Sequence, residues 1–194
     1  YEANADATLK LSKRWSTSLL VHYENETKAH DGNDDGFVDI PQVEQYNVWN
    51  RWAYMGDHYV FQAGIKALSE TRTSGQVNHG GTMHSGDLYK VGIDTERYEF
   101  FTKNAYIFNK EKNTNLALIL STTLHNQDAT YGRKLYNVDQ TNVYASLMFE
   151  TEFNPQNSFS AGLSFNYDAY DQHYRLNNNA DTPLKASDKE AVPG

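Results

Sequence analysis

The sequence has no cysteine and only 4 prolines among its 194 residues. The absence of cysteine excludes a disulfide framework and a thiolate metal site. Long apolar runs are also missing, and the mean hydropathy is -0.75, so no segment reaches the roughly 20 apolar residues of a membrane-spanning helix. No apolar stretch follows Tyr1, so the sequence predicts no signal peptide within this chain.

Positive charge is scarce relative to negative charge. The chain has 17 Lys and Arg against 25 Asp and Glu, which gives a formal net charge of -8. This balance argues against a nucleic-acid partner, which would require a basic surface. Aromatic residues are abundant, with 14 Tyr and 9 Phe. Low hydropathy combined with many aromatics favours an all-β chain in which every second residue is polar.

Alternation of apolar and polar residues is the clearest pattern in the chain. In 159–170, apolar side chains such as Phe159, Leu163 and Phe165 occupy every second position, and Ser160, Ser164 and other polar residues fall between them. Such period-two patterns indicate strands with one apolar face. The same pattern recurs in 59–70, 114–124 and 143–153. These strands are predicted to be roughly 10 or more residues long, against a usual length of about 5 to 6.

The predicted connectors alternate between short and long. Short turns are expected at Lys13-Arg14, Gly56-Asp57, Asn109–Thr114 and Asn154–Asn157, and long polar loops at 28–42, 72–92, 127–140 and 174–194. Short periplasmic turns and long outer loops are typical of transmembrane β-barrels. The predicted fold class is therefore all-β, an antiparallel up-and-down meander of about eight long strands that forms part of a large transmembrane β-barrel.

Aromatic residues cluster near the predicted strand ends, as expected for the two aromatic girdles of a membrane barrel. They are Trp15, Tyr54, Tyr59, Phe108, Phe153 and Phe159 near the short turns, and Tyr23, Tyr46 and Tyr170 near the long loops. A lipocalin-like barrel or a β-sandwich would show the same alternation, with the apolar face turned inward and shorter strands. Strand length, connector rhythm and girdles favour the membrane barrel.

Two long stretches, 35–76 and 112–153, carry a family resemblance. The first contains "QYN..NRW.Y" at 45–54 and the second contains "LH.QDA.YG...Y" at 124–136. Together they resemble the barrel of TonB-dependent outer-membrane receptors of the Bacteroidetes type, over nearly the whole chain. The resemblance implies a barrel of about 22 strands with a plugged lumen, in the outer membrane of a Gram-negative bacterium. It also implies active uptake of a scarce nutrient, powered through TonB.

Residues 1–194 are interpreted as a partial β-barrel domain that contains neither a plug domain nor a TonB box. The resemblance implies membrane lipid, a small-molecule nutrient, a plug domain, TonB and a surface lipoprotein as partners. A corrinoid such as vitamin B12 is the favoured cargo, and a ferric siderophore, haem or an oligosaccharide are the alternatives. The competing classes are a passive porin and a soluble β-protein that binds a ligand. Catalysis is not expected, because Ser74 lies in no nucleophile elbow.

The acidic stretch "DGNDDGFVDIP" at 31–41 follows the start of an EF-hand-type calcium loop. Alternate oxygen ligands converge on one hard cation in such a loop. The candidate ligands are Asp31, Asn33, Asp35, the carbonyl of Phe37, and Asp39. The bidentate Glu expected at the end of the motif is replaced by Gln42. The alternative is a solvated loop built from Asx-turns.

Aromatic and basic residues near the predicted outer loops are candidate nutrient contacts. They are Trp49, Tyr131, Arg133, Lys134 and Tyr136, with an ordinary surface loop as the alternative for the last four. His79 and His84, beside Met83, are weaker candidates for capture of haem or a metal, and His125 is expected to anchor a loop by hydrogen bonding. Charged residues are expected on the inward face, where they would contact a plug or simply line a wet lumen. They are Arg51, Lys66, Glu70, Glu99, Lys103, Glu150 and Glu152.

Overall fold

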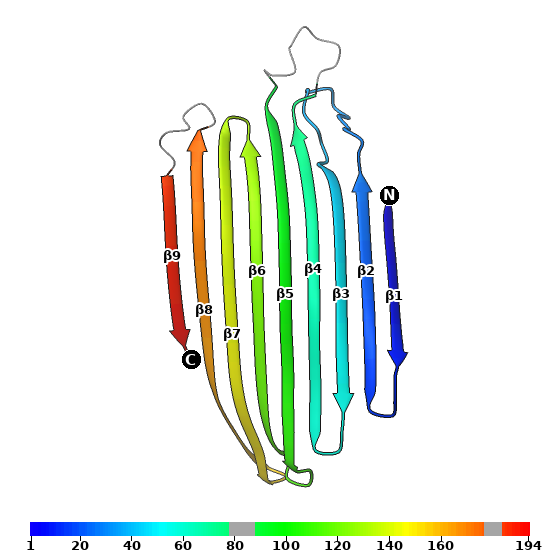
Figure 1. Cartoon of the computed structure of the whole chain (residues 1–194), viewed down its shortest axis with the longest axis vertical. Helices are drawn as coiled ribbons and strands as arrows, with labels where there is room; N and C mark the ends of the chain where they lie inside the picture. Colours follow the sequence, from blue (N-terminus) through cyan, green and yellow to red (C-terminus); the bar gives the residue numbers. More distant parts are fainter. Residues whose placement is uncertain (78–87, 177–183) are drawn as a thin grey trace.

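A computed structural model of the chain describes residues 1–77, 88–176 and 184–194. These residues form one antiparallel sheet of nine strands, in which each strand pairs with its neighbours in the chain (Figure 1). The strands are β1 (Glu2–Lys10), β2 (Trp15–Glu26), β3 (Gln42–Met55), β4 (Tyr59–Gly75), β5 (Lys90–Asn109), β6 (Thr114–Tyr131), β7 (Lys134–Asn154), β8 (Asn157–Leu176) and β9 (Leu184–Pro193). None of the described residues belongs to a helix long and apolar enough to cross a membrane.

The predicted up-and-down meander is confirmed, with nine strands rather than about eight. The four short turns lie at one end of the sheet, as predicted (Figure 1). The long connection before β3 is also confirmed. The strands are long: β7 has 21 residues and β5 and β8 have 20 each.

The long polar loop predicted at 127–140 is wrong. β6 continues to Tyr131, β7 begins at Lys134, and these two residues pair across a turn made of Gly132 and Arg133. Gly132 has a φ of 60° and Arg133 is not among the positive-φ residues, which is the pattern of a type II′ hairpin turn. The misprediction arose because polar residues on both faces of this hairpin look like a loop sequence. Cross-strand hydrogen bonds between such residues, for example from Asn126 Nδ2 to Asp139 Oδ1 at 2.5 Å, stabilise the hairpin instead.

The prediction of one long loop at 174–194 is also wrong, because β8 extends to Leu176 and β9 follows from Leu184. Half of the β9 residues are polar, yet β9 pairs with β8 from Leu184 opposite Tyr174 to Pro193 opposite Phe165. The loop predicted at 72–92 is shorter than expected, because β4 continues to Gly75 and β5 begins at Lys90. Outer strand segments are polar on both faces, so alternation could not mark their ends.

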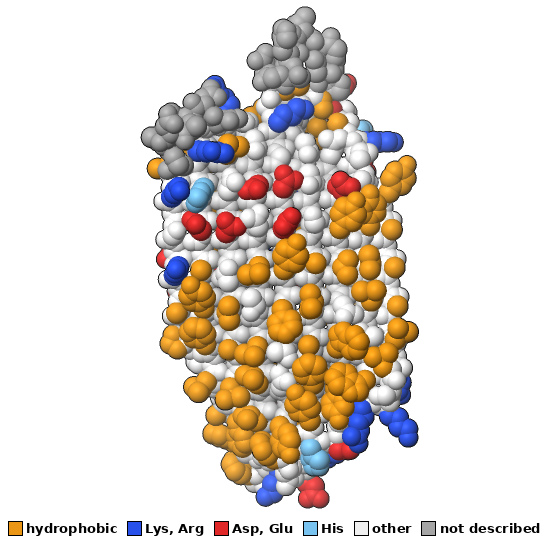
Figure 2. All heavy atoms as spheres, viewed as in Figure 1, with side chains coloured by type: hydrophobic (Ala, Val, Ile, Leu, Met, Phe, Trp, Pro, Cys, Tyr) orange, Lys and Arg blue, Asp and Glu red, His pale blue; other side chains and the backbone are white. Residues whose placement is uncertain are grey.

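Register and alternation together give the sheet an apolar face and a polar face. Residues that pair directly across neighbouring strands share a face, and we call such a set a rung. One rung of the apolar face contains Trp52, Ala63, Thr102, Leu120, Ala145 and Phe165. Figure 2 shows this face, on which hydrophobic side chains cover a broad zone from the short-turn end toward the loop end. We call that zone the apolar band.

Burial in this sheet is the reverse of that in a soluble globular protein. Among the described residues, no large side chain is fully buried, and the buried apolar residue is the small Ala129. Ile65 is 60% exposed and Leu163 is 72% exposed. A β-sandwich would cover such side chains with a second sheet, but the described strands make one sheet. The apolar face therefore needs a covering that these residues do not supply.

Candidate functional site

One set of polar side chains inside the apolar band, around Asn50, is hydrogen-bonded within the protein. Asn50 Nδ2 donates to Ser18 O at 3.1 Å and to Thr17 Oγ1 at 3.2 Å, while Asn50 Oδ1 accepts from Trp52 Nε1 at 2.7 Å. Thr17 Oγ1 in turn donates to Arg51 O at 3.0 Å. An exposed Asn in water requires no such partners. Internal satisfaction is what a non-aqueous environment demands.

A second set of polar groups on the same face shows the same arrangement. Tyr59 OH donates to Asn104 Oδ1 at 2.6 Å, and Asn104 Nδ2 donates to Thr102 Oγ1 at 3.1 Å. These residues lie on β4 and β5, and β4 pairs with β3, which carries Asn50. In these two sets, the polar atoms of the apolar band are hydrogen-bonded to neighbouring protein atoms.

Aromatic rings gather at the short-turn end of the apolar face. The ring centroids of Trp15 and Tyr54 are 5.1 Å apart, and those of Tyr106 and Phe108 are 5.0 Å apart. At the other end of the band, the centroids of Tyr23 and Tyr46 are 4.9 Å apart. The two predicted girdles are confirmed at these positions. The prediction that Tyr170 belongs to the outer girdle is wrong, because its pairing with Gln140 places it on the polar face.

A row of acidic side chains ends the apolar band on the loop side (Figure 2). Its members are exposed and occupy two neighbouring rungs of the apolar face. They are Glu44, Asp94, Glu96, Asp128, Asp139 and Asp171. Because charged groups are costly in hydrocarbon, this row sets the upper limit of any surface that lipid can cover.

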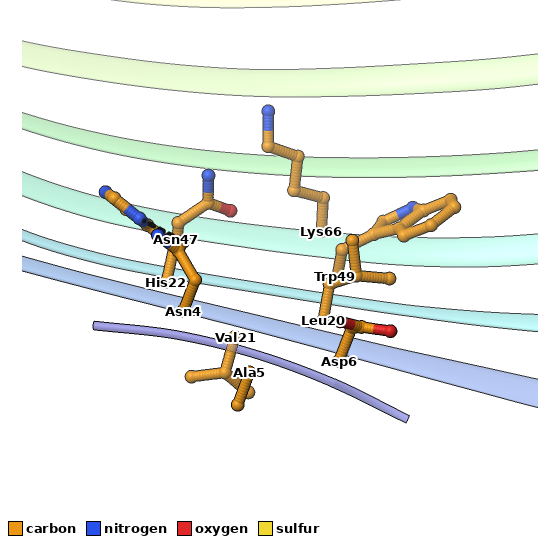
Figure 3. Close-up of a pocket in the computed structure, with 9 residues that line it drawn as sticks. All are labelled: Asn4, Ala5, Asp6, Leu20, Val21, His22, Asn47, Trp49 and Lys66. Carbon is orange, nitrogen blue, oxygen red and sulfur yellow. Dashed lines mark hydrogen bonds between the residues drawn. The ribbon is translucent and has the colours of Figure 1, made fainter. Parts of the chain in front are cut away.

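The opposite, polar face carries a shallow hollow of about 420 Å³ near the β1 edge. Figure 3 shows that Asn4, His22, Asn47 and Lys66 point to one side of the sheet, whereas Ala5 and Val21 point to the other. The hollow is also lined by Asp6, Leu20 and Trp49. An aromatic plane, amides, a carboxylate and an ammonium group therefore converge there. Such a lining can stack and hydrogen-bond a polar organic molecule or a protein segment.

Trp49 is the predicted ligand contact that this hollow contains. It pairs with Leu20 on one side and Lys66 on the other. The Arg51 guanidinium carbon lies 5.4 Å from the centroid of the Trp49 ring, within the range of a cation–π contact. Lys66 Nζ lies 3.8 Å from Glu99 Oε1, which also accepts from Arg97 Nε at 2.6 Å.

The charges predicted for the inward face do lie on the polar face, as the register of the strands shows. Among them, Glu70 accepts from Arg72 Nε at 2.6 Å and from Gln45 Nε2 at 2.6 Å. His125 also lies on this face, where it pairs with Arg97 and Gln140. Its Nδ1 atom is buried and has no hydrogen-bond partner, so the predicted anchoring bond is not present at that atom.

The other predicted nutrient contacts lie at the β6–β7 turn and do not join Trp49. Tyr131 and Lys134 flank the turn, and Arg133 is within it. Tyr136 OH donates to Gln172 Oε1 at 2.9 Å, so this ring is held against β8. Trp49 lies on a rung that reaches β6 at Thr123, well below the turn. The structure therefore divides the predicted set into two locations.

The acidic loop is organised by hydrogen bonds from its own backbone. Asp31 accepts from Gly36 N at 2.8 Å, Asp35 accepts from Phe37 N at 2.9 Å, and Asp39 accepts from Gly32 N at 2.7 Å. Gln42 Nε2, at the position of the missing bidentate ligand, donates to Thr27 O and closes the base of the loop. Within the part of the chain that the structure describes, no group of three or more acidic or histidine side chains is placed to hold a metal ion. These contacts explain the loop shape without calcium, and the calcium site stays a prediction.

Sequence analysis missed a polar network on β7 and β8. Asn142 Nδ2 donates to Asn166 Oδ1 at 3.0 Å and to Asp168 Oδ2 at 3.1 Å, and Gln140 Nε2 donates to Asp168 Oδ1 at 2.9 Å. The alternation of 159–170 had already placed Asn166 and Asp168 on one face. Only the register could show that Asn142 is opposite Asp168. His79, Met83 and His84 lie outside the described residues.

Comparison with known proteins shows a fold likeness without detectable sequence relatives. No family model and no curated protein matches the sequence. Among solved structures, the sheet is similar to part of the ferric yersiniabactin uptake receptor FyuA from Yersinia pestis, with a TM-score of 0.60 and 11% sequence identity. The match covers 100% of this chain and 33% of that receptor chain. The chain thus has the fold of a segment of that receptor's barrel, and it spans about a third of the receptor's length.

Proposed function

We propose that this chain forms part of the barrel wall of a TonB-dependent active transporter in the outer membrane of a Gram-negative bacterium. The observation that carries the proposal is the apolar band, a broad zone of exposed large side chains in which the Asn50 and Asn104 amides are hydrogen-bonded to protein. In this proposal lipid covers the apolar face, and the polar face lines the lumen. The short turns face the periplasm and the longer loops face outward.

The fold likeness supports a wall segment rather than a complete small barrel. β1 and β9 lie at the two edges of the sheet and have free edges among the described residues. A free edge has unpaired backbone N–H and C=O groups that can pair with further strands. In the proposed transporter those edges continue into the rest of a large barrel, and a plug domain fills the lumen and connects to TonB.

The proposed role is capture and uptake of a bulky, scarce nutrient, with no catalytic step. The Trp49 hollow and the β6–β7 turn are the two surfaces that a cargo or the plug would meet. FyuA is a receptor for ferric yersiniabactin uptake, and this supports a metal chelate as one cargo class. A corrinoid is a second candidate and rests on the sequence resemblance and the acidic loop at 31–41, and haem and an oligosaccharide stay as alternatives. The Bacteroidetes-type assignment and a surface lipoprotein partner rest on the sequence resemblance.

The placement of the faces is tested first. Nitroxide labels at Leu118 and Ile119, in the full-length protein that contains this chain, are compared in phospholipid vesicles. Leu118 belongs to the apolar face and the next residue, Ile119, to the polar face. We expect the label at Leu118 to collide with oxygen dissolved in lipid and the label at Ile119 not to do so. Equal exposure of both labels to a water-soluble nickel chelate would refute the membrane placement.

The transport step is tested separately in cells. Uptake of radiolabelled cyanocobalamin and of a radiolabelled ferric siderophore is measured with and without TonB. Energy-dependent uptake of either compound that stops when TonB is removed supports active transport and identifies the cargo class. Passage that persists without TonB indicates a passive porin.

A further inference from the structure

A groove of about 240 Å³ lies on the apolar face, within the apolar band and separate from the Trp49 hollow. Its floor is β4, where Ala63 and Gly64 are small. Trp52 on β3 and Phe100 on β5 flank this floor. At the short-turn end, Trp15 and Phe61 close the groove, with their ring centroids 6.2 Å apart in an edge-to-face arrangement.

The depth of the groove follows from the residues on both faces of β4. Ala63 projects little from the apolar face, and large rings stand on the strands beside it. Gly64 has no side chain, and the Phe101 ring occupies the space on the polar face where its Cβ would point. Phe101 thus covers β4 on the polar face, and on the apolar face the groove forms where the small Ala63 lies between Trp52 and Phe100. The stretch from Phe61 to Ile65 spans roughly 13 Å at about 3.3 Å per residue.

Most of the groove lining is apolar, and the polar groups of Asn50 and Trp52 are engaged within the protein. Asn50 is its polar lining residue, and both amide hydrogens are directed to Ser18 O and Thr17 Oγ1. Its Oδ1 accepts the indole N–H of Trp52, so that donor is also engaged. The remaining lining is aromatic or aliphatic, and Ile65 and Phe100 are exposed by 60% and 46%. A hydrocarbon chain suits such a surface, because it has no hydrogen-bonding groups and its burial against apolar side chains is favourable.

We propose that this groove is a binding site for one acyl chain of a membrane phospholipid. The proposal rests on the proposed function, because the groove continues the apolar band that lipid would cover. Its position beside Trp15 and the short turns assigns it to the periplasmic leaflet. There a lipid chain would lie along β4 between Trp52 and Phe100. Its residence time would be longer than that of the acyl chains that contact the rest of the apolar band.

The test uses the full-length protein in vesicles of phosphatidylethanolamine and phosphatidylglycerol. The vesicles include a small fraction of phosphatidylcholine with a diazirine in the middle of one acyl chain. After irradiation, lipid adducts are mapped to peptides by mass spectrometry. We expect several-fold more adduct on the peptides that carry Trp52, Ala63 and Phe100 than on those that carry Ala145 and Phe165. Both groups lie on the same rung or an adjacent one of the apolar face. Because the strands of a membrane barrel tilt by about 35–45°, the two groups differ in depth, and the variant that fills the groove separates the effect of the groove from that of depth.

Filling the groove is the decisive variant. Ala63→Phe should abolish the excess adduct, and Ala145→Phe, a matched change on the same rung outside the groove, should leave it intact. Heat-modifiable migration in gels checks that each variant folds, and Ala63→Leu replaces Ala63→Phe should the larger residue prevent folding. An unchanged pattern in the filled variant would overturn the proposal.

The remaining outcomes separate this proposal from the proposed function. Even labelling over the apolar face keeps the membrane placement and overturns the specific site. Protein–protein cross-links through Trp52 or Phe100 would show that a second copy fills the groove, which also overturns it. Absence of lipid adducts from the whole apolar face would refute the proposed function itself.

Discussion

Trp52 donates its indole N–H to the Asn50 side chain at 2.7 Å, two residues earlier on the same strand and on the same face. Both residues lie in the apolar band, where neither group could rely on water in a membrane. Asn50 completes the arrangement by donating to Ser18 O on β2. The Asn50 amide thus accepts from an indole on its own strand and donates to a backbone carbonyl on the neighbouring strand, so its own oxygen and nitrogen are both hydrogen-bonded.

Replacing Asn50 by Ala should destabilise the protein in lipid. Asn50→Ala leaves the Trp52 N–H without its acceptor in hydrocarbon, at a cost of about 1–3 kcal/mol in the free energy of unfolding. Asn142→Ala is the matched control, because Asn142 also makes several hydrogen bonds but lies on the polar face, where water can replace them. Urea unfolding from vesicles, followed by gel migration, measures both. Equal losses for the two variants would contradict a lipid-covered apolar face.

Placing a charge on the apolar face should cost more than placing it one residue away. Leu120 lies near the middle of the apolar stretch of β6, and Ile119 precedes it on the polar face. We expect Leu120→Arg to lower the free energy of unfolding by about 2–4 kcal/mol, as for a cation near the bilayer midplane. Ile119→Arg should cost clearly less. The comparison is made by urea titration in vesicles, and the reverse order would exchange the lipid and lumen faces.

Alternation predicted the two faces well because side-chain direction is a local property of a strand. Arg51, Lys66 and Glu99 were placed on the inward face from sequence spacing alone, and the register confirms that face. Spacing could not show that Lys66 approaches Glu99 or that Asn50 meets Trp52 and Ser18. Those contacts depend on how strands align, and alignment is set over the whole sheet.

Strand ends were predicted less well because they lie where the alternation stops. The hairpin around Gly132 has polar residues on both faces, so composition favoured a loop over two paired strands. Its backbone pairing is reinforced by side-chain hydrogen bonds, from Asn126 to Asp139 and from Asn137 Nδ2 to Asp128 Oδ1. The sequence does contain one local signal, "YGRK", with Gly at the first central position of a two-residue turn. At this position the glycine of the turn is a better predictor of the hairpin than the polarity of the flanking residues.

The same turn gives a prediction about Gly132. Its φ of 60° is unfavourable for other residues, and a Cβ there would lie 2.6 Å from the Tyr89 ring. We expect Gly132→Ala to lower the free energy of unfolding by roughly 1–2 kcal/mol from the backbone term, with a steric contribution in addition. Gly92→Ala is the control, since no atom lies within 4 Å of its Cβ position.

A double variant separates the two contributions at Gly132. Adding Tyr89→Ala to Gly132→Ala removes the ring that the new methyl group would meet, but leaves the backbone conformation unchanged. In urea unfolding, we expect Gly132→Ala to lower the free energy of unfolding less in the Tyr89→Ala background than in the original protein, but still to lower it. Full recovery would mean that the positive φ contributes nothing, and no recovery would mean that the ring moves aside freely.

The last prediction concerns the acidic loop at 31–41 and tests whether it binds calcium. Asp31 accepts from Gly36 N and Asp35 N, so Asp31→Ala should speed amide exchange at both positions even without metal. Calcium should bind only weakly, with a dissociation constant on the order of 10⁻⁴–10⁻³ M, because the bidentate position is filled by Gln42, which closes the loop base. Calorimetry with calcium, and with magnesium as the control, measures this affinity. Weak binding that Asp35→Ala removes would support the site. No heat from calcium, with the exchange effect of Asp31→Ala intact, would leave the carboxylates as backbone acceptors that shape an outer loop.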